Sequence, residues 1–217
     1  MKEFFCQQPL IYLITDGEIT ENNFLIKSKI TLQLIQTAVD VGVQLIQMRE
    51  KSLPARLVFQ LTVKAARITK HSNTKLLVND RADIARAANA DGVHLTSSSI
   101  PTEIIRQNFP DEFIIGVSAH SIEKAQLAQF GGADFVTYSP IFYSPNKGEP
   151  QGVETLRQVC ETLDTFPVIV LGGINETNFA ETLDAKAKGV AAIRLFTDNN
   201  KLPDIVKRIQ SFKRENE

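Results

Sequence analysis

Short apolar segments alternate with helical patterns along almost the whole chain. The apolar segments are too short for helices, and we predict strands at 10–14, 43–49, 76–78, 92–95, 113–117, 133–140, 166–171 and 189–193. Between them, apolar residues recur every three or four positions, first from Ile30 to Val41, which is typical of helices that bury one face. Strands that are apolar on both faces and are joined by helices form parallel sheets. The alternation therefore predicts an α/β fold.

Eight repeats of this strand and helix unit favour a closed barrel over an open sheet. The chain has 217 residues, and about 200 residues are the lower bound for a complete eight-stranded α/β barrel. No Gly-x-Gly-x-x-Gly motif follows the first predicted strand, so a dinucleotide-binding sheet has no support. We expect a single-domain TIM (β/α)8 barrel over residues 1–217, ending in a charged C-terminal tail at 213–217.

The balance of charge argues against nucleic-acid and membrane partners. Lysine and arginine total 24 residues, and aspartate and glutamate total 25, so no global field attracts a polyanion. No apolar run approaches the roughly 20 residues that span a bilayer. Cys6 and Cys160 lie far apart in the sequence, which suits free thiols in a reducing compartment. We expect a cytoplasmic protein that recognises small anions locally, and self-association stays open.

Polar residues end the second and third predicted strands. Strand alternation sends Gln47, Arg49 and Lys51 to the same side, where arginine suits bidentate phosphate contacts and lysine acts as a point charge. Asn79 and Asp80 end the next strand. A carboxylate beside cations commonly forms a structural ion pair, but beside a phosphate it can hold Mg²⁺. The spacing alone leaves an anion site and structural ion pairs equally open.

A second anion site is indicated at the seventh and eighth predicted strands. Gly172 and Gly173 end the seventh strand ahead of a helical pattern, and Arg194 ends the eighth. Unshielded backbone N–H groups at a helix start can cradle a phosphate, and barrels often bind phosphate after these two strands. A tight turn explains paired glycines by themselves, but their position together with Arg194 favours phosphate binding.

Histidine and serine residues near the fourth and fifth predicted strands are candidates for proton transfer. His94 lies inside a strand, where a histidine is more often a hydrogen-bonded core residue than a catalyst. Ser118 and His120 lie just past the fifth strand, where an imidazole can take or give protons near pH 7.

The longest irregular segment, 141–151, follows the sixth predicted strand. Long loops in compact barrels are usually functional lids or disordered excursions. Lys147 lies in this loop close to Ser144, so we expect the loop to close its lysine over a charged substrate.

Taken together, these motifs resemble the thiamine phosphate synthase and TenI superfamily. The resemblance covers nearly the whole chain, and its motifs are at 47–51, 78–85, 90–95, 115–121, 132–135, 139–142, 147 and 170–174. It implies a TIM barrel that binds a thiazole phosphate in vitamin B1 biosynthesis. In the synthase branch, a hydroxymethylpyrimidine pyrophosphate loses pyrophosphate, and the thiazole nitrogen captures the pyrimidine methylene.

The resemblance also implies a role for each matching residue. Gln47 would contact the pyrimidine, Asp80 would bind Mg²⁺, and Gly173 would contact the thiazole phosphate. The residues implied for the pyrophosphate are Arg49, Lys51, Asn79 and Lys147.

Three departures from the synthase pattern leave other functions open. Ser99 replaces a carboxylate that is a second metal ligand in synthases, which weakens a Mg²⁺ site. Asn146 stands in the sixth-loop motif, and Arg194 stands where a small-residue phosphate turn is usual. The alternatives are a metal-independent TenI-like thiazole tautomerase, in which His120 would move the proton, and a non-catalytic thiazole-phosphate or thiamine-phosphate binder. The intact cationic motif favours the synthase, because a tautomerase has no pyrophosphate to hold.

Overall fold

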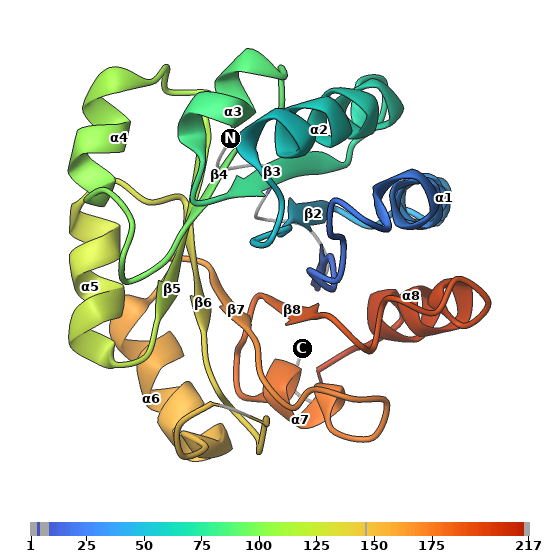
Figure 1. Cartoon of the computed structure of the whole chain (residues 1–217). Coiled ribbons are helices and arrows are strands. Elements are labelled where there is room, and N and C mark those ends of the chain that lie inside the picture. The colour runs from blue at the N-terminus through green and yellow to red at the C-terminus, as the bar shows by residue number, and fades with distance from the viewer. Residues whose placement is uncertain (1–3, 5–8, 146, 215–217) are drawn as a thin grey trace.

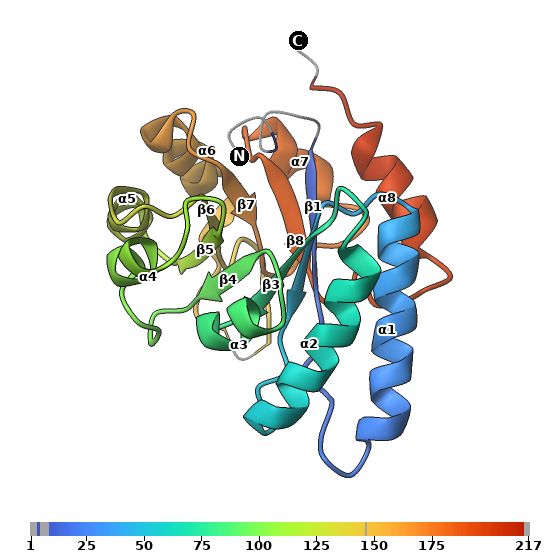
Figure 2. The same cartoon turned by 90° about the horizontal axis from the view of Figure 1, so that it is seen from above.

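The computed structural model describes residue 4 and residues 9–145 and 147–214. In this part of the chain, eight parallel strands form one closed barrel inside a ring of eight helices (Figures 1 and 2). The strands are β1 (Leu10–Ile14), β2 (Leu45–Met48), β3 (Lys75–Asn79), β4 (Gly92–Leu95), β5 (Ile114–Ala119), β6 (Phe135–Tyr138), β7 (Val168–Val170) and β8 (Gly189–Ala192). The helices are α1 (Phe24–Asp40), α2 (Ala55–Thr69), α3 (Ala82–Ala87), α4 (Thr102–Asn108), α5 (Ile122–Phe130), α6 (Gly152–Leu163), α7 (Phe179–Asp184) and α8 (Leu202–Gln210).

Pairing of the first strand with the last closes the barrel. Leu10 of β1 lies beside Gly189 of β8, and each other strand pairs with its neighbours in chain order. This arrangement confirms the TIM barrel predicted from the alternating pattern.

Two apolar clusters hold the strands and helices together. The larger cluster fills the space between strands and helices, with Ile11 and Leu13 of β1 among its members. The smaller one fills the barrel interior and consists of Leu10, Tyr12, Ile14, Leu45, Leu77, Ile114, Phe135, Ile169 and Ala191. Successive residues of β1 therefore point to opposite faces of the sheet. The interior cluster forms a packed layer beneath the open end of the barrel.

Some predicted boundaries were wrong. Helix α1 begins at Phe24, although the apolar spacing indicated a start near Ile30. Its early apolar residues Leu25 and Ile26 are 79% and 70% exposed, so a search for a buried stripe does not detect the first turns. Strand β7 is limited to Val168–Val170, because the apolar run predicted as a strand also includes residues of the loops before and after it.

Part of the predicted charged tail packs on the barrel. The Arg214 guanidinium donates hydrogen bonds to the carbonyl oxygens of Leu183 and Ala187. Residues 215–217 of the tail lie outside the described residues, as do Cys6 and Asn146. Among the residues that are described, no helix has the length and apolar character needed to cross a membrane.

Glu50 fastens the loop after β1 to the end of β2. Its side chain is buried, and its carboxylate accepts hydrogen bonds from Thr15 Oγ1 at 2.6 Å and from the backbone N–H of Ile19 at 3.2 Å. Burial raises the pKa of the Glu50 carboxyl, and the hydrogen bonds oppose this shift only in part.

The Glu50→Gln variant should reveal a pH-dependent cost of this buried carboxylate. A raised pKa means that the folded state binds the Glu50 proton more tightly than the unfolded state does. Glu50 therefore contributes stability at pH values below its unfolded pKa, and this contribution is lost as the pH rises through its folded pKa. In urea unfolding, the stability of wild type relative to Glu50→Gln should therefore be greater at about pH 4 than at about pH 7.5. A relative stability that increases with pH would contradict this sign.

Candidate active site

A cavity of about 780 Å³ opens at the carboxyl ends of the strands. Every strand, or the loop that follows it, contributes to its lining. In α/β barrels this end carries the active site, because the loops after the strands converge there. Of the residues predicted from sequence, those that line the cavity are Gln47, Arg49, Lys51, Asn79, Ser118, His120, Ser144, Lys147, Gly172, Gly173 and Arg194.

Three cations converge on one side of this cavity. Burial lowers the pKa of Lys51, and the nearby charges of Arg49 and Lys147 lower it further. Within the described residues, none of the three has a carboxylate within ion-pair distance. The structural ion pair that the spacing left open is therefore not formed, and the cations are available to an anionic ligand.

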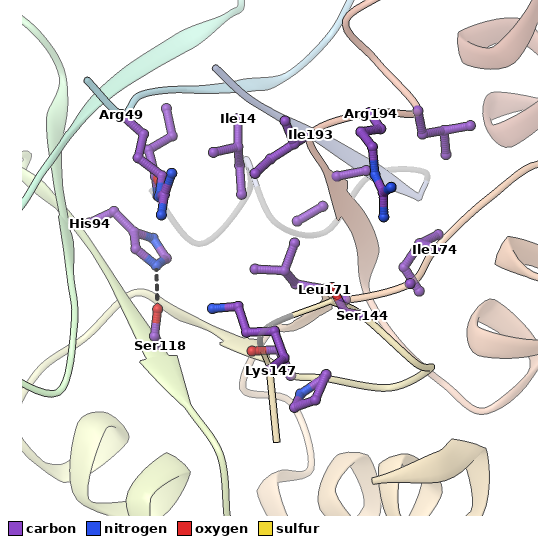
Figure 3. A pocket seen from close by; sticks show the side chains of 18 of the residues that line it. Ile14, Arg49, His94, Ser118, Ser144, Lys147, Leu171, Ile174, Ile193 and Arg194 are labelled. Carbon is purple, nitrogen blue, oxygen red and sulfur yellow. Dashed lines mark hydrogen bonds between the residues drawn. The ribbon is translucent and has the colours of Figure 1, made fainter. Parts of the chain in front are cut away.

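Arg49 is held by the loop after β1. Its backbone N–H donates to Thr15 Oγ1 at 2.9 Å, and the same hydroxyl donates to Glu50. Gly17 has a φ of +77°, and a Cβ there would lie 3.2 Å from a guanidinium nitrogen of Arg49. The loop thus packs closely against Arg49 and directs its side chain into the cavity (Figure 3).

The paired glycines form a tight turn on the opposite side. Gly172 and Gly173 have φ values of +97° and +70°, and a Cβ on Gly173 would lie 2.6 Å from the carbonyl oxygen of Tyr143. The backbone N–H of Phe142 donates to the Gly172 carbonyl at 3.0 Å, so the turn packs against the loop after β6. Across the cavity from Arg49, Arg194 lies on the same side as Ile174, the residue that directly follows this turn (Figure 3).

The predicted helix start is not adjacent to these glycines. Helix α7 begins only at Phe179 and has six residues. Between the glycines and the helix, Asn175 and Asn178 form a hydrogen-bonded turn, with the Asn175 N–H donating to Asn178 Oδ1 at 2.8 Å. The phosphate-binding potential of this side therefore depends on the turn and on Arg194, not on a helix dipole.

A chain of hydrogen bonds crosses the floor of the cavity. Gln47 Nε2 donates to Tyr12 Oη at 2.9 Å, Tyr12 Oη lies 3.1 Å from His94 Nδ1, and His94 Nε2 lies 3.0 Å from Ser118 Oγ. His94 is buried with both ring nitrogens bonded, as expected for a core histidine, and burial lowers its pKa to about 3. Sequence reasoning missed Tyr12, since it looks like any other apolar strand residue.

A hydrogen bond to the backbone selects one tautomer of the neutral His120 ring. Its Nδ1 lies 2.6 Å from the carbonyl oxygen of Ser139. A carbonyl oxygen only accepts, so Nδ1 carries a proton, and Nε2 of the neutral ring is left as a base. His120 lines the cavity, where this nitrogen is able to exchange a proton with a ligand.

Lys201 is a cation that sequence reasoning did not single out. It lines the cavity, although it precedes α8 and is not at the end of a strand. The predictions concentrated on strand ends, and nothing in the local sequence marks Lys201 as part of the site.

Asp80 is the one predicted site residue that does not line the cavity. It is exposed at the mouth with a φ of +61°, and its charge acts on Lys51. Ser99 Oγ accepts from the Thr96 N–H at 2.7 Å and so is part of the turn after β4. The described residues contain no cluster of three acidic, histidine or cysteine side chains suited to a metal. This donor set fits a Mg²⁺ ion only if Asp80 shares it with ligand oxygens and water.

This fold and this cavity define the class of the protein as an α/β-barrel enzyme with a cationic pocket at its catalytic end. Residues 11–196 match the family model described as thiamine monophosphate synthase. The chain belongs to this family.

Named relatives agree with the family. A Geobacter sulfurreducens protein provisionally named thiamine-phosphate synthase is 40% identical over 84% of this chain and 84% of its own length. The thiamine-phosphate synthase of Clostridium novyi is 34% identical over 88% of this chain and 91% of its own. The solved thiamine phosphate pyrophosphorylase of Pyrococcus furiosus has a TM-score of 0.77 and 29% identity, covering 92% of this chain and 96% of its own. These relatives make the chain an enzyme of thiamine biosynthesis, in the transferase class.

Proposed function

We propose that this chain is a thiamine phosphate synthase that joins a hydroxymethylpyrimidine pyrophosphate to a thiazole phosphate with release of pyrophosphate. The observation that carries the proposal is the convergence of Arg49, Lys51 and Lys147 without a carboxylate partner among the described residues. Three positive charges held close together repel one another, and an anion bound between them relieves this repulsion. A pyrophosphate has the charge to do so.

The two sides of the cavity suit the two substrates. The pyrophosphate would bind to the three cations, Arg49, Lys51 and Lys147, and to Asn79. The thiazole phosphate would bind on the opposite side, to the turn at Gly172 and Gly173 and to Arg194. Ser144, on the same loop as Lys147, lies close by. Holding both substrates in one pocket replaces an encounter in solution with a positioned reaction.

The proposed chemistry is a displacement at the pyrimidine methylene carbon. The bond from this carbon to the pyrophosphate oxygen breaks, and its electron pair leaves with the pyrophosphate. The lone pair of the thiazole nitrogen forms the new C–N bond. The guanidinium of Arg49 and the ammonium groups of Lys51 and Lys147 stabilise the charge that develops on the leaving group. A Mg²⁺ ion held by Asp80 and the pyrophosphate oxygens would supply further charge neutralisation.

A second candidate function, proton transfer in a thiazole tautomerase, has the support of His120. Its Nδ1 proton is fixed on the Ser139 carbonyl, and its other nitrogen is available as a base. Ser99 stands where synthases have a second metal ligand, and its hydroxyl is hydrogen-bonded within the turn after β4. This arrangement also suits a reaction without a metal. The cations at Arg49, Lys51 and Lys147 have no function in that reaction, so we propose the synthase first.

The sequence-based expectations about location and partners stay predictions. They are a cytoplasmic location, no nucleic-acid or membrane partner, and self-association as an open question.

The purified chain, incubated with both substrates and Mg²⁺, should release pyrophosphate only when both substrates are present. A coupled pyrophosphate assay measures this directly. Asp80→Asn should shift the activity to higher Mg²⁺ concentrations, because one ligand charge is lost.

Absence of pyrophosphate release at high enzyme concentration would reject the synthase. Aromatisation of a thiazole carboxylate phosphate without metal, lost in His120→Asn, would support the tautomerase in its place. Tight binding of thiazole phosphate or thiamine phosphate with neither reaction would identify a non-catalytic binding protein.

A further inference from the structure

We propose that Tyr12 and His94 are positioning residues that fix the direction of the hydrogen bonds on the cavity floor. In this arrangement Ser118 donates its hydroxyl proton into the cavity, and Gln47 offers its carbonyl oxygen there. The direction of the bonds follows from the orientation of the Gln47 amide and from the burial of Tyr12 and His94. Its consequence for catalysis rests on the proposed synthase function.

The first step is set by the burial of Tyr12. Its side chain is 0% exposed, and among the described residues its hydroxyl contacts Gln47 Nε2 at 2.9 Å and His94 Nδ1 at 3.1 Å. The amide nitrogen of Gln47 only donates, so the hydroxyl proton of Tyr12 has one acceptor, His94 Nδ1. An unmade hydrogen bond at such a buried group costs about 1–3 kcal/mol, which holds the proton on this acceptor.

The second step is set by the charge of His94. Its ring is 3% exposed and packs near Tyr12 and Phe135, so burial disfavours the imidazolium. The positive charge of Arg49 disfavours it further. A neutral ring that accepts at Nδ1 carries its only N–H proton at Nε2. The nearest acceptor of this proton is Ser118 Oγ at 3.0 Å, and Thr137 Oγ1 lies further away at 3.4 Å.

The third step sets the direction of the Ser118 hydroxyl proton. Its oxygen accepts from His94 Nε2, and Thr137 Oγ1 is a second donor at 3.5 Å. With its lone pairs occupied, the Ser118 hydroxyl directs its own proton towards the cavity that it lines. Because Gln47 has committed its amide nitrogen to Tyr12, its carbonyl oxygen is the group left for a ligand.

The floor therefore presents an acceptor at Gln47 and a donor at Ser118. A heterocycle that fits must offer an N–H donor to the first and a ring acceptor to the second. An aminopyrimidine edge has this pattern, whereas the corresponding oxopyrimidine edge has the reverse. Fixed polar groups reject a reversed partner strongly, because both sides are left unpaired.

The direction of the hydrogen bonds on the cavity floor is tested by NMR of ¹⁵N-labelled histidine side chains. This measurement distinguishes the two neutral tautomers of histidine without any assay of activity. The chain has three histidines, and His94→Gln identifies the His94 signals by their loss. We expect a neutral His94 with its proton on Nε2 from about pH 5 to pH 8. In Tyr12→Phe the preference for this tautomer should weaken. The matched control Tyr138→Phe, at a buried tyrosine outside the floor, should leave it unchanged. A proton on Nδ1, or a cationic ring at pH 6, would overturn the proposal.

Kinetics test the consequence for catalysis. Tyr12→Phe removes the hydroxyl to which the Gln47 amide donates, so it should lower kcat/KM for the pyrimidine substrate by about tenfold. KM for the thiazole phosphate should be unchanged. His94→Gln, whose amide N–H can replace the Nε2 proton, should retain more activity than His94→Leu at equal thermal stability. Equal losses in both His94 variants, or an unchanged Tyr12→Phe enzyme, would overturn the positioning role. If wild type releases no pyrophosphate, the proposed function fails, and the NMR result still decides the direction of the bonds.

Discussion

Replacing Arg49 with methionine should lower kcat/KM for pyrophosphate release by roughly 10²–10³-fold, the usual effect of removing one group that stabilises developing negative charge. Arg49 has no ion-pair partner among the described residues, so its charge is available to the leaving group. Methionine keeps much of the apolar stem, so the loop after β1 retains its packing. Steady-state kinetics with varied pyrimidine substrate measure the loss.

Two further variants make this result specific. Arg49→Lys keeps a point charge but loses the planar fork, so its activity should fall between wild type and Arg49→Met. Arg56→Met removes an exposed arginine of α2 and should leave activity unchanged. Near-wild-type activity in Arg49→Met would place the pyrophosphate elsewhere.

Gly173→Ala should raise KM for the thiazole phosphate at least about tenfold and lower stability by roughly 1–3 kcal/mol. The residue has a φ of +70°, which disfavours alanine, and the new Cβ would lie 2.6 Å from the Tyr143 carbonyl oxygen. Relief of this overlap must move the turn that faces Arg194. Substrate titrations and thermal unfolding measure the two effects.

The loop after β6, against which this turn packs, provides a control for this variant. A Cβ on Gly148 would meet nothing within 4 Å, and the residue does not have a positive φ, so Gly148→Ala should change neither KM nor stability appreciably. In Gly173→Ala, KM for the pyrimidine substrate should change less than KM for the thiazole phosphate. An equal rise in both would argue against separate binding sides.

The position of the site was predictable because strand ends can be located from sequence. Arg49, Asn79 and Gly172 each follow a short apolar segment, and in a closed parallel barrel all such positions meet at one end. The start of α1 was missed because its first apolar residues are exposed. Lys201 was missed because it reaches the cavity from the segment before α8, far from any strand end.

The sequence by itself determined the barrel and the cationic motif, because alternation and strand-end chemistry are local patterns. Only the tertiary structure decided whether those cations are paired, where Asp80 lies relative to the cavity, and which groups orient Ser118. Tyr12 and His94 are separated by 82 residues, and their contact depends on the alignment of β1, β4 and β5 inside the barrel. Such contacts follow from strand register and closure, which no short stretch of sequence encodes.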